Sequence, residues 1–290
     1  MHERTSFTEN TVTLTAPVTS ANIIPPGEDV AAGTLLVPKG KILTASDLAL
    51  IAGQGIAEIG VYKKLSIGLI STGSELLNTG SPLEYGKIYN TNPYLLGGYI
   101  QKHHMTANYL NTVSDDLDSL CRAVLEALKT NDIVITTGGV SAGDFDYMPE
   151  VIHRIGGDLL FHRLKFKPGG AMLGAFKDGK VILGLSGNPG AAATGLLCVG
   201  FPFMRKLSGR SDITFSQATA YLGVDFKKSS PVTRILKGHS DFKNGMLYFT
   251  PLSNQHNGSV SSMSDCDLLA VIPAGSKPLA AGDKLEVYIL

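Results

Sequence analysis

The sequence predicts an α/β protein in which a mostly parallel, doubly wound sheet carries helices on both faces, followed by a small all-β domain. Two features of the 290 residues support this class: apolar runs alternate with helical segments in the middle of the chain, and only short strand-like runs follow. The length also exceeds that of most single domains. We therefore expect an N-terminal segment with a short helix at 1–64, an α/β domain at 65–209 and a β-barrel-like domain at 210–290.

The first clear helix signal lies at residues 44–52. Thr44 or Ser46 can cap this helix, because a hydroxyl there accepts a hydrogen bond from a free backbone N–H group. Leu48 and Ile51 follow at helical spacing, and a glycine closes the segment. The N-terminal segment is therefore expected to contain one short helix.

The α/β domain is predicted from strand and helix signals that alternate along the chain. The expected strands lie at 66–71, 106–113, 132–136 and 180–185, and the expected helices at 92–101, 119–128, 146–155 and 191–207. This alternation is typical of βαβ units, so the strands should pair in parallel with helices on both faces. In the last part of the chain, short runs at 232–236, 245–249, 268–272 and 284–289 predict the strands of the all-β domain.

The charge balance argues against two classes of partner. The chain holds 25 Lys and Arg against 25 Asp and Glu, so its formal net charge is zero. Nucleic-acid-binding and membrane-surface proteins use a basic excess, which this composition does not have. We expect a small-molecule ligand, no nucleic-acid partner and no membrane partner.

The cysteines and the N-terminal residues predict a location. Cys121, Cys198 and Cys266 have neither the spacing of a zinc site nor that of a disulfide framework, which fits a reducing compartment. Residues 1–18 carry acids and no apolar core, unlike a signal peptide. We therefore expect a cytoplasmic protein.

Three loops predict a pocket for phosphate or another oxyanion. In a doubly wound sheet, ligands bind beyond the carboxyl ends of the strands. Three of these ends combine glycines with polar residues just before a helix, where free backbone N–H groups favour anions. The residues concerned are Thr72 and Gly73, then Gly138, Gly139, Val140, Ser141 and Gly143, and finally Ser186, Gly187, Asn188 and Pro189. The alternative is that they are only turn and cap residues.

The glycine spacing in these loops argues against two classes of nucleotide-binding site. None of them has the phosphate-loop pattern GxxxxGK[ST] or the dinucleotide pattern GxGxxG. Nucleotide hydrolysis and hydride transfer therefore lose support.

Carboxylates at the same edge suggest a divalent cation. Glu75 follows the first loop, Asp115 and Asp116 begin a helix, and Asp144 and Asp146 follow the second loop. Mg²⁺ is usually held by one or two carboxylates together with substrate oxygens, so Glu75 and Asp146 are the expected metal ligands. Asp115 and Asp116 have an equally good alternative as ordinary first-turn helix residues.

A basic segment could reach the ligand. Arg163, Lys165 and Lys167 alternate with Leu164 and Phe166, which puts the three cations on one face of an extended strand. A solvated strand face is the alternative.

The histidines have no partner at metal-ligand spacing. His103, His104 and His153 are therefore expected at the surface.

Five motifs, taken in order, resemble the molybdopterin-binding domain of the molybdopterin molybdenumtransferase family. They are residues 70–76, 88–92, 137–147, 167–169 and 184–189. The Gly-Gly-Val-Ser segment at 138–141 is the most specific of them, and the resemblance also extends to 27–61 and 259–290. Molybdopterin adenylyltransferases resemble only residues 66–209, so adenylyl transfer is a less favoured alternative.

The resemblance implies a late step of molybdenum cofactor synthesis. Adenylylated molybdopterin would bind, AMP would leave with Mg²⁺ assistance, and molybdate would be inserted. Glu75, Asp116 and Asp146 correspond to the acidic site residues, and Lys167 corresponds to the first lysine of a turn that continues as Pro168 and Gly169. The ligand-cradling residues are Gly138, Gly139, Ser141, Gly187 and Asn188. The resemblance further implies a homodimer and a molybdopterin adenylyltransferase as partner.

The sequence departs from the family pattern in several places. The second lysine of the turn is Gly170, the first residue of the third loop is Ser186, and an expected aspartate is Asn90. Residues 12–24 resemble only the last strand of the family's preceding domain. These departures keep open a second hypothesis, a non-catalytic protein that binds molybdopterin or the finished cofactor.

Overall fold

The computed structural model describes residues 4–17, 24–140 and 146–290. The chain forms two compact units, Met1–Ile59 and Gly60–Leu290, which are described separately. The division into three parts at 64/65 and 209/210 stays a prediction.

The first unit contains the predicted short helix. Strands β1 (Thr5–Phe7) and β2 (Val12–Leu14) pair antiparallel, and α1 (Ala45–Gly53) follows them. Thr44 is the N-cap: its hydroxyl accepts a hydrogen bond from the Asp47 N–H group, and the Asp47 carboxylate accepts one from the Thr44 N–H group. Such a reciprocal cap stabilises the first turn of a helix, so the helix and Thr44 as its cap are confirmed.

The second unit begins with a six-stranded sheet of the predicted class. Its strand order is β6-β3-β7-β11-β10-β8. The members are β3 (Ser66–Thr72), β6 (Thr106–Val113), β7 (Ile133–Thr137), β8 (Asp158–His162), β10 (Leu173–Lys177) and β11 (Lys180–Leu185). The first four strands in this order pair in parallel, and β10 and β8 add two antiparallel pairings that the sequence did not predict. The mostly parallel sheet is therefore confirmed.

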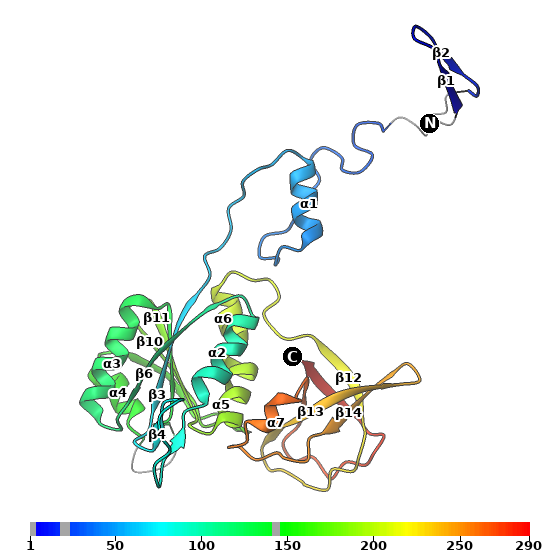
Figure 1. The fold of residues 1–290 in the computed structure, drawn as a ribbon. Coiled ribbons are helices and arrows are strands. Elements are labelled where there is room, and N and C mark those ends of the chain that lie inside the picture. The colour runs from blue at the N-terminus through cyan, green and yellow to red at the C-terminus, as the bar shows by residue number, and fades with distance from the viewer. Residues whose placement is uncertain (1–3, 18–23, 141–145) are drawn as a thin grey trace. The chain divides into compact units, whose positions relative to one another are not determined.

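Helices cover both faces of this sheet (Figure 1). One face packs against α2 (Asn92–Lys102), α5 (Pro189–Gly195), a π-helical turn (Leu196–Gly200) and α6 (Phe201–Leu207). The other face packs against α3 (Leu117–Thr130) and α4 (Met148–Arg154). The single helix expected at 191–207 thus begins at Pro189 and is interrupted by the π turn, and the helix expected at 146–155 begins only at Met148.

The C-terminal strands close into a barrel. Strand order β14-β12-β16-β15-β13 is completed by a β13–β14 pairing, so no edge is left among these five strands. The strands are β12 (Gln217–Leu222), β13 (Thr233–Lys243), β14 (Met246–Pro251), β15 (Leu268–Ile272) and β16 (Lys284–Ile289), with α7 (Ser261–Ser264) between β14 and β15. Leu222, Phe249 and Val287 are buried in its core, which confirms the β-barrel prediction.

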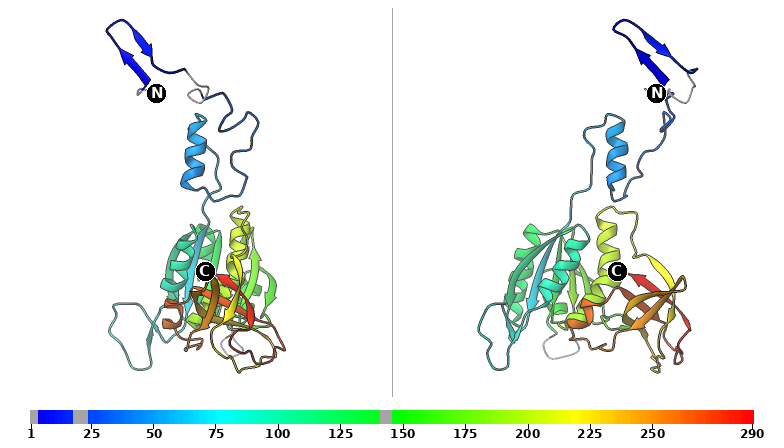
Figure 2. Two further views of the ribbon diagram at one scale, coloured as in Figure 1. Left: turned by 90° about the vertical axis from the view of Figure 1, so that its right-hand side faces the viewer. Right: turned by 45° about the vertical axis from the view of Figure 1, so that its right-hand side comes forward.

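The sheet and the barrel share a core. Ile235 and Leu269 of the barrel belong to the same buried cluster as Leu196 and Phe201 of the helical layer. The right-hand view of Figure 2 shows the helices of this layer between the sheet and the barrel. Strand β9 (Phe166–Lys167), which comes from the α/β part of the chain, also pairs in parallel with β13.

Two further sequence expectations are corrected. The cations Arg163, Lys165 and Lys167 are exposed as predicted, but only Phe166–Lys167 form a strand, because the backbone at Arg163 turns with φ 66°. His103 is half-buried instead of lying at the surface, since its ring packs edge-on against Phe201.

No helix among the described residues has the length and apolar character needed to cross a bilayer.

Candidate functional site

The carboxyl ends of β3, β7 and β11 lie side by side, as the sequence predicts. Thr137, the last residue of β7, is in register with both Ser71 and Leu185. The Gly138 N–H group donates to the Leu185 carbonyl oxygen at 2.9 Å. The three loops that leave these strands therefore begin at one place on the sheet edge.

Gly138 is the point where the three loops meet. A Cβ atom at Gly138 would lie only 2.8 Å from the Thr72 carbonyl oxygen, and one at Gly187 would lie 3.7 Å from the Gly138 Cα. Gly138 also has φ 105°, which L side chains rarely adopt. A side chain at this position would push the first and second loops apart.

Buried polar side chains form a hydrogen-bond network at the end of β3, where the first loop begins. The Ser71 hydroxyl donates to Asn90 Oδ1 at 3.3 Å, and the Thr137 hydroxyl donates to Ser71 Oγ at 3.2 Å. Asn90 Nδ2 donates to Thr112 Oγ1 at 3.2 Å. Because an amide both donates and accepts, Asn90 bridges two neighbours where an aspartate could only accept.

Asn92 links α2 to the third loop. Its Nδ2 donates to the Gly187 carbonyl oxygen at 2.8 Å, and its Oδ1 is buried without a hydrogen-bond partner among the described residues. Ser71 and Asn92 lie within the sequence motifs at 70–76 and 88–92, but the sequence assigned neither of them a role of its own.

Glu75 lies at the mouth of the first loop. Its side chain is exposed, and both carboxylate oxygens fold over Gly73, 2.6 and 2.7 Å from where a Cβ atom would stand. The neighbouring Ser74 N–H group donates to Asp115 Oδ2 at 3.3 Å. Glu75 and Asp115 therefore both place negative charge at the end of β3.

Asp116 serves as a helix cap in this structure. It is the N-cap of α3, where its Oδ1 accepts a hydrogen bond from the Ser119 N–H group at 2.8 Å, and this bond lowers the pKa of the carboxyl. Of the two acids expected at this edge, it is Asp115 that bonds to the first loop. A catalytic role for Asp116 stays a prediction.

Asp146 accepts a hydrogen bond from Arg163 and lies beside His162, and one of its carboxylate oxygens has no partner among the described residues. Its side chain is only 14% exposed, with Oδ2 at 3.5 Å from His162 Nε2 and 3.4 Å from Arg163 Nη2. Oδ1 is buried and has no hydrogen-bond partner among the described residues. A buried carboxylate oxygen in this state is a ready ligand for a hard cation. His162 has no sequence motif and was not predicted.

The structure describes only the first part of the second loop, up to Val140. Ser141, Gly143 and Asp144 lie outside the described residues. Val140 is 1% exposed and belongs to the core beneath α3 and α4, so only its backbone can contact a ligand.

The third loop is completed by the barrel, which corrects one expectation. The carbonyl oxygen of Asn257 accepts hydrogen bonds from the N–H groups of Gly190 (2.8 Å) and Ala191 (3.2 Å). Pro189 has no N–H group, and the Asn188 N–H group donates to Ser186 Oγ at 3.2 Å. The helix start that was expected to offer free N–H groups is thus already bonded, and the exposed parts of this loop are Gly187 and Asn188.

Lys237 is a buried cation next to this loop that sequence reasoning missed. Its side chain is 0% exposed and lies 3.2 Å from where a Cβ atom of Gly190 would stand. Its Nζ donates to the His256 carbonyl oxygen at 3.2 Å and to the Ser262 hydroxyl. Burial lowers the pKa of Lys237, because desolvation disfavours the charged form.

The turn that follows Lys167 packs against α5. Gly169 has φ 96°, and a Cβ atom there would lie 3.0 Å from the Ala191 carbonyl oxygen. At Gly170, the carbonyl oxygens of Leu164 and Phe166 occupy the space that a side chain would need. The local packing of this chain therefore leaves no room for the family's second lysine at position 170.

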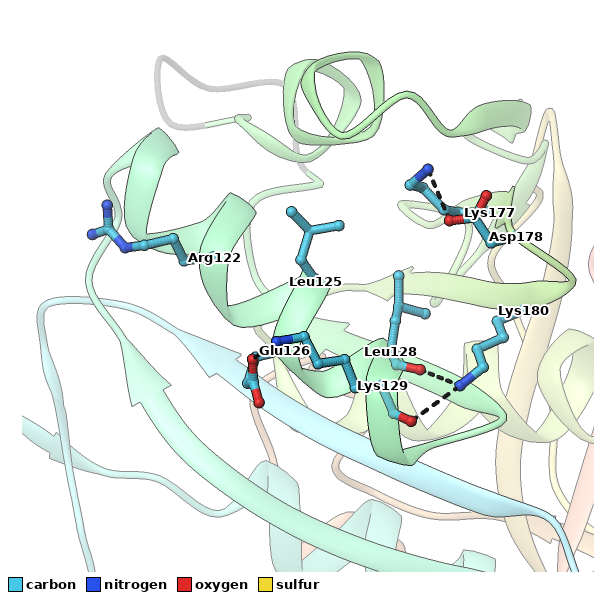
Figure 3. Close-up of a pocket in the computed structure, with 8 residues that line it drawn as sticks. All are labelled: Arg122, Leu125, Glu126, Leu128, Lys129, Lys177, Asp178 and Lys180. Carbon is cyan, nitrogen blue, oxygen red and sulfur yellow. Dashed lines mark hydrogen bonds and ion pairs between the residues drawn. The ribbon is translucent and has the colours of Figure 1, made fainter.

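An open groove of about 710 Å³ lies away from the three loops (Figure 3). Four basic and two acidic side chains come from α3 and from the turn between β10 and β11 to line it. The residues are Arg122, Leu125, Glu126, Leu128, Lys129, Lys177, Asp178 and Lys180. Lys180 is the first residue of β11, and the third loop follows Leu185, the last residue of β11. The groove therefore lies at the opposite ends of the strands from the three loops.

Comparisons with known proteins match both the α/β part and the barrel part of the chain. A probable molybdopterin binding domain matches residues 68–206, and the MoeA C-terminal region (domain IV) matches residues 219–290. A molybdopterin molybdenumtransferase of Staphylococcus aureus is 34% identical over 290 residues, covering 100% of this chain and 69% of the relative. One from Bacillus subtilis is 35% identical over 272 residues, covering 94% and 63%. A crystal structure of the molybdopterin biosynthesis MoeA protein from Pyrococcus horikosii has a TM-score of 0.83 at 25% identity, covering 99% of this chain and 70% of that one.

Proposed function

The chain belongs to the molybdopterin molybdenumtransferase family of molybdenum cofactor biosynthesis, and we propose that it binds adenylylated molybdopterin and transfers molybdate to it. The observation that carries this proposal is the meeting of Thr72, Gly138 and Gly187 at one sheet edge. Glycines let the backbone approach a ligand closely, and the edge beyond parallel strands is where such sheets bind ligands.

The side chains around these loops have separate tasks in this proposal. The exposed Gly187 and Asn188 contact the pterin part of the substrate, and the backbone of Gly138 and Gly139 lies against its phosphates. Lys167 supplies positive charge, since its side chain is exposed and the turn after it packs on α5. Asn92, whose Oδ1 is buried and unpaired, is placed to accept a hydrogen bond near Gly187.

Mg²⁺ is the metal that the acids of the site fit best. No group of three His, Cys, Asp or Glu side chains suited to a metal occurs in the described parts of the chain. Mg²⁺ needs only one or two carboxylates, because substrate oxygens and water complete its shell, and Asp146 offers an unpaired buried oxygen. In this proposal Asp146 and Glu75 hold the ion, which when bound neutralises charge on the phosphates as AMP leaves.

The same proposal extends to assembly and location. We expect a homodimer that works in the cytoplasm and receives its substrate from a molybdopterin adenylyltransferase.

A second candidate is a protein that binds molybdopterin without turning it over. Gly170 favours it, because a lysine that would add a charge-assisted contact in the family turn is absent and cannot fit. The two candidates differ in whether AMP is released.

The experiment combines purified protein with adenylylated molybdopterin, molybdate and Mg²⁺ and measures AMP release by chromatography. The matched variants are Gly138→Ala, at the meeting point of the loops, and Gly98→Ala, an exposed helix position with open space around it. We expect wild type and Gly98→Ala to release AMP, and Gly138→Ala to lose most of this activity while its melting curve stays cooperative. Binding without AMP release would select the second candidate, and failure of the wild type to bind the pterin would refute both.

A further inference from the structure

Arg163 has a backbone conformation that its residue type rarely adopts. Its φ is 66°, in the left-handed region. The other non-glycine residues with positive φ in the described parts of the chain are His104, Asp178 and Asn244. Histidine, aspartate and asparagine are several-fold enriched in this region, whereas an arginine there is an exception that calls for a reason.

The backbone around Arg163 does not supply that reason. Its N–H group donates to the Met172 carbonyl oxygen at 2.8 Å, directly after the last residue of β8. Glycine would make the same hydrogen bond and would adopt the positive φ without strain. The Arg163 side chain is 49% exposed, so it adds little packing. Strained backbone of this kind is concentrated at functional sites, which points to a task for the side chain.

The Arg163 side chain contacts Asp146. Its Nη2 donates to Asp146 Oδ2 at 3.4 Å, and His162 Nε2 lies 3.5 Å from the same oxygen. Neither group contacts Oδ1, which is buried and has no hydrogen-bond partner among the described residues. The carboxylate is therefore held through one oxygen, and the other oxygen is left for a ligand.

We propose that Arg163 is a positioning residue, which holds Oδ2 of Asp146 so that Oδ1 faces the divalent cation, and that His162 supports the same orientation. A carboxylate that is not held turns easily about its last torsion angle, because the preference of that torsion is broad. Outer groups that fix a metal-binding carboxylate raise the metal affinity for this reason. This assignment rests on the proposed function, in which Asp146 and Glu75 hold Mg²⁺.

The charge of Arg163 alone predicts the opposite effect. A cation beside a metal ligand repels the metal ion, so its removal would strengthen metal binding. Positioning instead predicts that metal binding weakens when the side chain is removed. The sign of the change in affinity therefore separates the two effects.

The test measures Mn²⁺ binding to the full chain without any pterin, from the electron paramagnetic resonance signal of the free ion. Arg163→Gln removes the guanidinium, and Arg163→Gly removes the whole side chain while suiting the backbone conformation. The matched control is Arg154→Gln. Arg154 is also 49% exposed, and at the C-terminal end of α4 it lies 3.1 Å from the exposed carboxylate of Glu150, with His153 beside the same carboxylate. The control therefore repeats the combination of arginine, histidine and carboxylate outside the metal site.

We expect the Mn²⁺ dissociation constant to rise roughly tenfold or more in Arg163→Gln and Arg163→Gly, and to stay within about twofold in Arg154→Gln. Arg163→Lys keeps the charge without the planar fork and should bind with intermediate affinity. His162→Leu should weaken binding, and His162→Gln, which keeps an N–H donor, should restore part of it. The melting temperature of Arg163→Gly should stay near that of wild type, because relief of the positive φ offsets the greater freedom of glycine in the unfolded chain.

The proposal is overturned if Arg163→Gln and Arg163→Gly bind Mn²⁺ as tightly as Arg154→Gln does, or more tightly. It is also overturned if Arg163→Gly loses Mn²⁺ binding together with several degrees of melting temperature, since Arg163 would then have a structural role.

Asp146→Asn distinguishes these failures from a failure of the proposed metal site. Loss of Mn²⁺ binding in Asp146→Asn, with normal binding in the Arg163 variants, refutes the positioning role alone. Mn²⁺ binding in Asp146→Asn equal to that of wild type refutes Asp146 as a metal ligand, and the positioning role with it. Since the titration uses no pterin and measures no AMP release, binding and turnover of the substrate are tested independently.

Discussion

The Asn257 carbonyl oxygen of the barrel accepts a hydrogen bond from the Gly190 N–H group at the start of α5, at 2.8 Å. The same oxygen accepts a second bond from Ala191 at 3.2 Å. The C-terminal barrel thus completes the third ligand loop of the α/β sheet. Both N–H groups would otherwise be free at a helix start, where they attract anions, so the barrel also decides which donors remain for the substrate.

Lys237→Met should loosen this contact. The substitution removes the ammonium group that donates hydrogen bonds to the His256 carbonyl oxygen and to the Ser262 hydroxyl. We expect the free energy of unfolding to fall by about 1–3 kcal/mol, because hydrogen bonds from a charged donor are lost. Urea denaturation measures it, with Lys228→Met as the exposed control. Equal stability of the two variants would show that the buried ammonium does not hold the loop.

His103 should make stability fall in mild acid. Its pKa is lowered from 6.5 to about 4, because burial and then the neighbouring Arg205 charge disfavour the protonated ring. Arg205 Nη2 lies 3.3 Å from His103 Nδ1, an arrangement that suits a neutral acceptor. The unfolded chain binds the proton more tightly, so stability is lost as the pH falls from about 6.5 to about 4.

The check on His103 compares melting temperatures across this pH range. His103→Gln should lose part of the acid slope, whereas His104→Gln, an exposed neighbour, should keep it. Identical slopes for the two variants would rule out His103 as the titrating group.

Gly170→Lys should destabilise the protein instead of restoring a family contact. The carbonyl oxygens of Leu164 and Phe166 occupy the space of the new Cβ atom. Overpacking of this kind costs about 1–3 kcal/mol, which corresponds to a melting temperature lower by several degrees. Gly98→Lys is the control, since that glycine faces open space on α2. A Gly170→Lys protein as stable as this control would contradict the packing described here.

Asp146→Asn should raise the Mg²⁺ concentration needed for AMP release. The amide keeps the shape of the side chain but removes the negative charge from the unpaired buried oxygen. We expect the half-saturating Mg²⁺ concentration to increase at least roughly tenfold. Asp158→Asn, an exposed position in β8, is the matched control. An unchanged Mg²⁺ dependence would remove Asp146 from the metal site.

The architecture was predictable where local pattern and burial agree. The apolar runs at 66–71 and 132–136 were predicted as strands and lie in the centre of the sheet. Gly138 and Gly187 were predicted in loops at the strand ends, and these loops meet there. Strands β8 and β10 were missed because they lie at one side of the sheet and pair antiparallel, which no βαβ pattern signals.

The parts of the site that were not predictable depend on contacts distant in sequence. A lysine in a strand usually points to solvent, and Lys237 is buried only because residues 255–262 fold back over it. The N–H groups at the start of α5 were expected to be free, because nothing near Gly190 in sequence reveals that Asn257 will accept from them.

Hydrogen–deuterium exchange with and without adenylylated molybdopterin tests the central claim, that the ends of β3, β7 and β11 form the binding site, most directly. Protection should appear together in peptides that contain Gly73, Gly138 and Gly187. It should be absent from those that contain Leu125 and Lys177, which line the groove at the opposite sheet edge. Protection at that groove with unchanged exchange at the three loops would contradict the account.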